Sequence, residues 1–318
     1  MCLPTGKLEK LVKISIVVPI YNEADGIKHF LEELRFVIEN LKHDFEVLLV
    51  NDGSTDNTFS EIKSVKWSKV QIINLISNSG HMAALEAGLS LCSGEVVITM
   101  DSDLQHPVEC IPIMIERYLS SNCDVVLGIR ERTKSESLIK RKLSDHFYRI
   151  LSVLSKTKIE KNAGDFRLMS RQVVTTLNNL PEQQKVFRFL VTTFGYKIQT
   201  FKFIAPERKF GQSKYSYKHL WRLAITSLIG FSTAPLTAIF VGGLVVFMIS
   251  IVYVIYLLVN YLIGNTPPGW TSLAVLVVSL SSIQIIAIGL IGRYISEILS
   301  EIRARPRYII RNIENEGQ

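Results

Sequence analysis

Short apolar runs alternate with amphipathic stretches along the first two thirds of the chain. The apolar runs are rich in Val, Ile and Leu and have the length of buried strands; they cover residues 13–19, 45–50, 70–74, 95–99, 124–129 and 198–204. Segments typical of helices separate the earlier runs, at about residues 26–40, 82–92 and 110–121. This alternation predicts an α/β domain whose sheet is parallel or mostly parallel, with helices on both faces.

The pattern changes after residue 222. Residues 223–292 contain no Asp, Glu, Lys, Arg or His. This stretch is long enough for two membrane spans of about 20 residues each. We expect the spans at about residues 235–263 and 271–292; the alternative is a buried helical hairpin in a soluble protein.

The charge balance is basic, with 36 Lys and Arg against 29 Asp and Glu and a pI near 9.1. Such a balance suits nucleic acid, anionic lipid or a phosphate-bearing substrate. The long uncharged stretch favours the membrane, so no nucleic-acid partner is expected. The four cysteines lack any paired or metal-type spacing, which indicates reduced thiols in a cytosolic compartment.

Basic residues flank the uncharged stretch on both sides, and positive flanks stay cytoplasmic. Both termini are therefore expected in the cytoplasm. The expected domains are a catalytic domain at residues 1–214, an amphipathic interface helix at 215–232, a two-helix transmembrane hairpin at 233–298 and a cytoplasmic tail at 299–318.

Polar signatures follow three of the predicted strands, at residues 21–23, 51–54 and 101–103. Ligands of parallel sheets bind outside the carboxyl ends of the strands, so we expect these signatures to meet at one edge. In an extended chain Asp101 and Asp103 point to the same side and converge on one hard cation; the alternative is a solvated loop that carries two acids. The chain contains no glycine-rich phosphate loop, so a diphosphate would be held by metal and side chains.

Two later segments carry further candidates. Asp165 and Arg167 lie on a short predicted strand, where they either pair with each other or Asp165 faces the reacting centre. The segment at residues 206–215 combines three cations with a glycine and a hydroxyl, which suits either phosphate oxygens or a membrane surface. The basic stretch at residues 130–142 is either a solvated loop or one attracted to anionic headgroups.

Five motifs in this order, at residues 18–23, 51–56, 101–107, 164–167 and 208–215, resemble those of the family-two inverting glycosyltransferases of GT-A fold. More narrowly, the chain is similar to the polyprenyl-phosphate glycosyltransferases, which include dolichyl-phosphate mannose synthases and bactoprenol glucosyltransferases. One departure is Asn51, which stands where many relatives have an Asp.

The resemblance implies transfer of a hexose, in the first place glucose from UDP-glucose, to undecaprenyl phosphate for cell-surface glycan or O-antigen modification. It also implies Mg²⁺ or Mn²⁺ as cofactor, the bacterial inner membrane as location, and a homo-oligomer, namely a tetramer. GDP-mannose, UDP-N-acetylhexosamine and aminoarabinose donors stay open. Two rival functions are a processive polysaccharide synthase, whose Q-x-x-R-W signature is absent, and a non-catalytic component of a lipid-sugar translocation system.

The resemblance also implies roles for individual residues. The nucleoside would contact four residues, namely Pro19, Tyr21, Glu23 and Asp52. Asp101 would lie by the ribose and diphosphate and near the metal, Asp103 would ligate the metal, and Gln105 would line the donor site. The donor diphosphate or lipid phosphate would contact Arg208, Ser213 and Lys214. Asp165 would lie near the sugar and the acceptor, as a base or as an orienting group.

Overall fold

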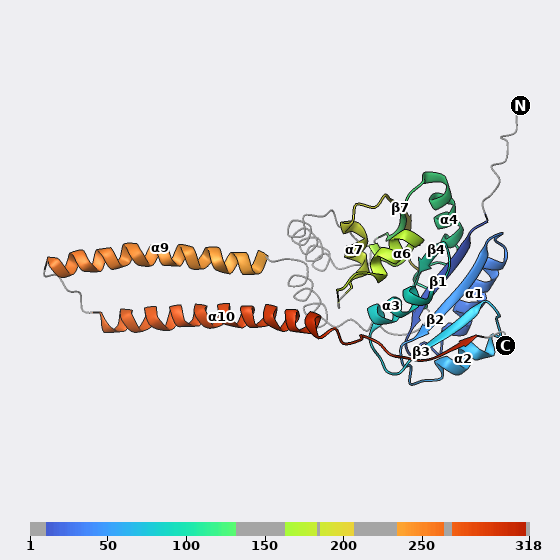
Figure 1. Cartoon of the computed structure of the whole chain (residues 1–318), viewed down its shortest axis with the longest axis horizontal. Coiled ribbons are helices and arrows are strands. Elements are labelled where there is room, and N and C mark those ends of the chain that lie inside the picture. Colours follow the sequence, from blue (N-terminus) through green and yellow to red (C-terminus); the bar gives the residue numbers. More distant parts are fainter. Residues whose placement is uncertain (1–10, 132–162, 183–184, 207–233, 264–268, 316–318) are drawn as a thin grey trace, which may run out of the picture. The chain divides into compact units, whose positions relative to one another are not determined.

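The computed structural model of the chain describes residues 11–131, 163–182, 185–206, 234–263 and 269–315. By their contacts these residues form two compact units. The first contains the β-sheet and its helices, together with the described residues from 306 onward. The second contains the two long helices α9 and α10 (Figure 1).

The first unit is built on an eight-stranded sheet with the order β7-β5-β6-β4-β1-β2-β3-β8. Its strands are β1 (Lys13–Ile20), β2 (Asp44–Asn51), β3 (Val70–Leu75), β4 (Val96–Thr99), β5 (Val125–Arg130), β6 (Ala163–Ser170), β7 (Ile198–Phe203) and β8 (Ile310–Asn315). Neighbours pair in parallel except β6, which is antiparallel to β4 and β5, and β8, which is antiparallel to β3. The predicted mostly parallel α/β sheet is therefore confirmed.

Helices cover both faces of this sheet. They are α1 (Ile27–Glu39), α2 (Thr58–Ser64), α3 (His81–Leu91), α4 (Cys110–Ser121), α6 (Arg171–Asn178) and α7 (Phe187–Thr193). The core that contains buried residues of α1, α2 and α4 also takes alternate residues of β1, namely Ile14, Ile16, Val18 and Ile20. Helix α3 contacts β1 and β2, and α6 and α7 both contact β6. Because both faces are covered, the central strands β1 and β2 are buried and mostly apolar.

Helix α1 shows why the sequence pattern locates these elements. Its buried residues are Ile27, Phe30, Leu31, Leu34 and Ile38. Positions three and four apart lie on one face of a helix, so these side chains form one apolar stripe against the sheet.

The second unit consists of α9 (Ala234–Leu262) and α10 (Trp270–Arg303), which contact each other. Both predicted spans are thus helical. By length and hydropathy, one stretch among the described residues qualifies as a membrane span, Ile283–Arg303 in α10; a shorter apolar stretch, Ile239–Tyr253, lies in α9. The expected pair of spans is therefore not confirmed, and the stretch that qualifies extends beyond the predicted limit at residue 292.

The segment expected as a tail at residues 299–318 contains the end of α10 and a strand. Helix α10 continues to Arg303, and β8 then pairs with β3 at the edge of the sheet. Lys63 Nζ lies 2.6 Å from Glu314 Oε2, and the Ile76 N–H donates to the Ile309 carbonyl at 3.0 Å. No strand was expected here, because the pattern of residues 310–315 is too polar to stand out.

Candidate functional site

The carboxyl ends of β4, β1 and β2 lie side by side, since these strands are parallel neighbours. The polar segments that follow β1 and β2 also contact each other. The Asn22 N–H donates to Ser54 Oγ at 3.0 Å, and the Glu23 N–H donates to Thr58 Oγ1 at 2.9 Å. The expectation that signatures far apart in the sequence meet at one edge of the sheet is confirmed.

Asp52 fixes the turn that precedes α3. Its two carboxylate oxygens accept hydrogen bonds from the backbone N–H groups of Ser79, at 2.7 Å, and Gly80, at 2.9 Å. Burial raises the pKa of the Asp52 carboxyl above its ordinary value of 3.8, although these hydrogen bonds and the nearby His81 lower it. Gly53 follows with φ of +64°, and a Cβ there would lie 2.6 Å from the Ser77 carbonyl carbon. Asp52 and Gly53 together hold this turn against the end of β2.

Asn51, the departure from the family pattern, has a structural partner. Its Nδ2 donates to Asn74 Oδ1 at 3.0 Å, and its Oδ1 accepts the Ser54 N–H at 3.0 Å. Both asparagines are buried. An Asp at position 51 has no N–H group to give Asn74, so the amide suits this pair.

The loop that carries Asp101 and Asp103 is bent, not extended. Leu104 has φ of +60°, and Asp103 Oδ1 accepts the Gln105 N–H at 3.1 Å in a tight turn. The reasoning that an extended chain points both acids to one side is therefore wrong for this loop. That Asp101 and Asp103 share a cation stays a prediction.

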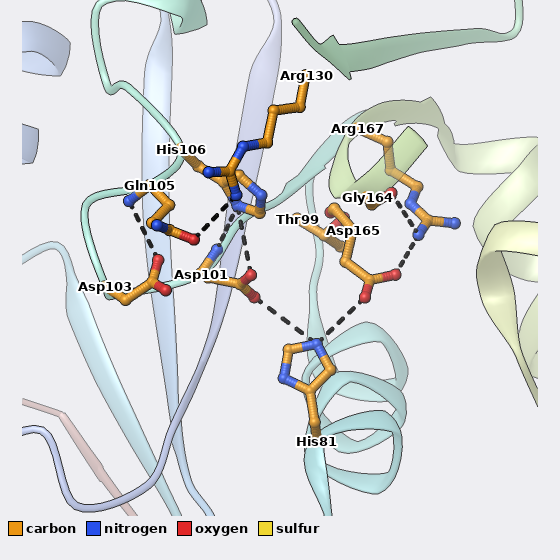
Figure 2. A network of polar contacts seen from close by, with 10 residues as sticks. All are labelled: His81, Thr99, Asp101, Asp103, Gln105, His106, Arg130, Gly164, Asp165 and Arg167. Carbon is orange, nitrogen blue, oxygen red and sulfur yellow. Dashed lines mark hydrogen bonds and ion pairs between the residues drawn. The ribbon is translucent and has the colours of Figure 1, made fainter. Parts of the chain in front are cut away.

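His106 supports this loop, a role for which the sequence offered only its place next to Gln105. Its Nδ1 accepts the Asp101 N–H at 2.9 Å (Figure 2). The buried ring stacks on Phe166 of β6 with 4.9 Å between centroids. This acceptor and this stack fix the backbone at Asp101.

Asp165 lies at the beginning of β6, next to the end of β4. Its Oδ1 pairs with Arg167 Nη2, and its Oδ2 lies 3.3 Å from His81 Nε2 (Figure 2). The Thr99 hydroxyl donates to the Asp165 carbonyl at 2.5 Å. Of the two alternatives from the sequence, the pairing of Asp165 with Arg167 is present, and that Asp165 faces the reacting centre stays a prediction. His81 was missed, because nothing in its local sequence distinguishes it from any surface histidine.

Some of the remaining predicted residues lie in the part of the chain that the structure describes, and others lie outside it. Pro19 is buried in β1, and Tyr21 and Glu23 directly follow this strand. Gln105 Oε1 accepts a hydrogen bond from Arg130 Nη1 at 3.2 Å. Three predicted phosphate-binding residues, Arg208, Ser213 and Lys214, and the predicted interface helix at 215–232 lie outside the described residues.

The donor set at the loop suits a hard divalent cation. Within the described residues, no three His, Cys, Asp or Glu side chains form a metal cluster. Mg²⁺ commonly needs only one or two carboxylates, because substrate phosphates and water supply its other ligands. Asp101 Oδ1 is buried and accepts no hydrogen bond from the described residues. A buried carboxylate oxygen in this position fits a cation that arrives with the substrate.

Comparison with known proteins identifies a matching family and similar proteins. The profile of "Glycosyl transferase family 2" matches residues 15–177. The bactoprenol glucosyl transferase of Shigella phage SfV is 38% identical over 304 residues, which cover 95% of this chain and 99% of that protein. The prophage bactoprenol glucosyl transferase homolog of Escherichia coli K12 is 36% identical over 306 residues, which cover 95% and 100%.

A solved structure supports the fold. The crystal structure of glucosyl-3-phosphoglycerate synthase from Mycobacterium tuberculosis, in complex with Mn²⁺, UDP and glucosyl-3-phosphoglycerate, superposes with a TM-score of 0.51 at 18% identity. The match covers 70% of this chain and 80% of that one. With the family match over residues 15–177 and similarity to its relatives along nearly their whole length, the chain belongs to glycosyl transferase family 2 and is a glycosyltransferase.

Proposed function

We propose that the chain transfers a hexose, in the first place glucose from UDP-glucose, to undecaprenyl phosphate with inversion at the anomeric carbon. The observation that carries this proposal is the similarity to bactoprenol glucosyl transferases over 95% of the chain. The arrangement of Asp101, Asp103 and Asp165 around one edge of the sheet supports a site for sugar transfer.

The donor would bind along the ends of β1 and β2. Pro19, Tyr21, Glu23 and Asp52 would contact the nucleoside, and Gln105 would line the donor site. The hydrogen bonds from the Ser79 and Gly80 N–H groups to Asp52 support this role. They make the backbone beside such a site rigid before the nucleotide binds.

Mg²⁺ or Mn²⁺ would be held by Asp103, with Asp101 beside it, and would offset the negative charge that develops on the departing nucleoside diphosphate. The bent loop and the His106 contact keep these two acids in place without the cation. Further positive charge for the diphosphate or the lipid phosphate would come from Arg208 and Lys214, with Ser213 as a hydroxyl donor.

The nucleophile is a phosphate oxygen of the lipid. It forms a bond to the anomeric carbon while the bond between that carbon and the diphosphate oxygen breaks, and the electron pair leaves with the nucleoside diphosphate. A phosphate monoester has its second pKa near ~6, so it is largely ionised at pH 7 without a protein base. Asp165, which already pairs with Arg167, is therefore best suited to orient the acceptor or a sugar hydroxyl.

The membrane would be the bacterial inner membrane, with α9 and α10 as two spans and both termini in the cytoplasm. The absence of charged residues between 223 and 292 and the basic flanks support this topology. An Asn265→Cys variant should react with a membrane-impermeant maleimide added to intact spheroplasts, whereas Asp44→Cys should react only after lysis. Labelling of both or of neither from outside would contradict the two-span arrangement.

The direct test is transfer itself. Membranes that contain the full chain are incubated with undecaprenyl phosphate, Mn²⁺ or Mg²⁺, and radiolabelled UDP-glucose, UDP-N-acetylglucosamine or GDP-mannose. We expect label in the lipid fraction with UDP-glucose, and its loss on addition of a chelator. Transfer from another donor only would overturn the proposed sugar, and no lipid-linked product from any donor would overturn the proposed acceptor.

A further inference from the structure

His81 lies at the start of α3 with its ring between two carboxylates, one in the loop after β4 and one on β6. Its Nε2 is 3.3 Å from Asp165 Oδ2 and 3.6 Å from Asp101 Oδ1 (Figure 2). No family motif singled out in the sequence contains this residue.

The contact geometry determines which ring nitrogen carries a hydrogen. Because Nε2 faces an oxygen of each of two carboxylates, a lone pair there would repel both, so Nε2 is the N–H nitrogen. Its hydrogen is donated to Asp165 Oδ2 at 3.3 Å, and Asp101 Oδ1 lies next to the same N–H group at 3.6 Å, beyond hydrogen-bond distance. The ring therefore lies between a carboxylate on the loop after β4 and one on β6, with its N–H group facing both.

Each carboxylate is also held from a second side. The pairing of β4 with β6 ends with Thr99 opposite Arg167, two residues before Asp101 on one side and two residues after Asp165 on the other. Asp165 Oδ1 is held by Arg167, and the Asp101 backbone by His106. Only the two inner oxygens, Asp165 Oδ2 and Asp101 Oδ1, face each other across His81.

The placement of His81 depends on the close packing of α3. At Gly88 a Cβ would lie 2.3 Å from Val17 Cγ1, so α3 contacts β1 more closely than any side chain would allow. The turn before His81 is fixed by Asp52. A ring on a helix held at both of these points can define the positions of its two partners.

We propose that His81 is a positioning residue that ties Asp165 to Asp101 and so sets the orientation of Asp165 toward the reacting sugar and the acceptor. This inference rests on the proposed function, because it assigns Asp165 an orienting role in hexosyl transfer. Two carboxylates near each other repel, and the positive end of the Nε2–H group between them offsets this repulsion. Without His81, Asp165 would lose this contact, keep its pairing with Arg167 and turn away from the loop.

The test compares His81→Ala with His81→Gln in the transfer assay. The amide nitrogen of Gln is as many bonds from Cβ as Nε2 of His and can donate to the same oxygens. Loss of a supporting contact of this kind typically costs about 10- to 100-fold in rate. We expect His81→Ala to lower kcat by about this factor with the donor KM changed less than about threefold, and His81→Gln to recover most of the loss.

A double-mutant cycle with Asp165→Asn separates positioning from a direct role. If His81 acts through Asp165, His81→Ala should lower kcat by less than about twofold in the Asp165→Asn background. The control is His29→Ala, which removes a histidine of similar exposure that contacts Glu33 on α1. It should leave kcat and the melting temperature unchanged.

The solved structure of His81→Ala supplies a readout that needs no substrate. We expect the Asp165 carboxylate in a new or a second conformer in this variant and in its original one in His81→Gln. An unchanged Asp165 in His81→Ala, an unchanged kcat, or equal losses in both backgrounds would overturn the inference. Absence of transfer by the wild-type chain would overturn the proposed function instead, and the structural comparison would still decide the role of His81.

Discussion

In the proposed reaction Asp103 acts at the leaving group, through the cation, and Asp165 acts at the acceptor. Asp103→Asn removes the carboxylate expected to hold the cation, so transfer should fall by at least about 1000-fold. Asp165→Asn keeps the shape but loses the ionised partner of Arg167 and His81, and should lower kcat by about 100-fold. Calorimetry of UDP in Mn²⁺ should show weakened binding for the first variant and near-normal binding for the second.

The control for both substitutions is Asp44→Asn. Asp44 is exposed at the beginning of β2, which is the opposite end of this strand from Asp52. This variant should transfer at the wild-type rate. Normal turnover by Asp103→Asn would contradict the metal role, and loss of UDP binding in Asp165→Asn would place that residue in the donor site.

Glu46, which lies away from the candidate site, makes the stability of the fold depend on pH. Burial alone would raise the pKa of Glu46, but hydrogen bonds from Ser15 and Ser93 and the charge of Lys13 outweigh it and hold the pKa below its ordinary 4.5. The stabilisation of the fold by ionised Glu46 is therefore present above pH 4.5, and it is lost as the pH falls through the lowered pKa of Glu46. Glu46→Gln should cost about 1 kcal/mol at pH 7.

Thermal unfolding of the full chain in detergent, from pH 7 down to pH 3, measures this effect. The gap in melting temperature between wild type and Glu46→Gln should be widest at pH 7 and should close in acid. Glu32→Gln, at an exposed position of α1, is the matched control and should give a pH-independent difference near zero. A difference in melting temperature between wild type and Glu46→Gln that widens in acid would contradict a lowered pKa of Glu46.

At the residue scale, the sequence indicated the acids but not the histidines that hold them. Asp101, Asp103 and Asp165 belong to motifs, and their positions after or on strands are readable. His106 lies within the motif at residues 101–107 and contacts Asp101 inside the same loop, but the motif does not show this contact. The place of His81 beside Asp101 and Asp165 depends on the pairing of β4 with β6 and the packing of α3. The bend at Leu104 was also not readable, since a positive φ is uncommon for leucine.

Helix α3 is the element whose position bears most on the site. In Gly88→Ala the new methyl group would meet Val17 Cγ1 at 2.3 Å and Val50 Cγ2 at 3.0 Å, so the helix must move outward. Overpacking of this kind costs about 1–3 kcal/mol. We expect a lower melting temperature and, because His81 moves with the helix, a lower kcat.

The comparison variant for Gly88→Ala is Ser90→Ala on the exposed side of the same helix. It should leave kcat unchanged. If Gly88→Ala lowered the melting temperature but kept kcat, α3 would serve packing alone and would not set the position of His81.

Most elements of the first unit were predictable, and their pairing was not. The apolar runs gave β1 to β5 and β7 within one or two residues, because buried parallel strands are apolar throughout. The insertion of β6 between β4 and β5 depends on contacts between residues 34 to 74 positions apart in the chain, which no local pattern records. Strand β8 was missed since its polar residues match those of an exposed segment.

For the whole molecule, the segment after α10 is an integral part of the first unit. It pairs with β3, Arg307 Nη1 lies 3.3 Å from Glu86 Oε2 on α3, and the same Glu86 pairs with the buried Lys185 at 2.9 Å. Deletion of residues 306–318 should therefore lower the melting temperature by about 5–10 °C, which for a unit of this size corresponds to a few kcal/mol. It should also reduce transfer, because Glu86 is on the helix that carries His81.

Deletion of residues 316–318, which follow β8, is the control and should preserve both the melting temperature and the rate of transfer. Scanning calorimetry of the detergent-solubilised chain and the lipid-transfer assay supply the two measurements. A truncation at 305 that melts like the wild type would show that β8 contributes nothing to the sheet.

The position of β8 has a consequence for biosynthesis. Ribosomes complete β3 at Leu75 but reach Asn315 only after another 240 residues, roughly 10 to 50 s later at ~5–20 residues/s. During this interval the nascent chain exposes the outer edge of β3, which invites aggregation. The sheet is completed only after both long helices have been translated, so the first unit reaches its full sheet later than its other strands would allow.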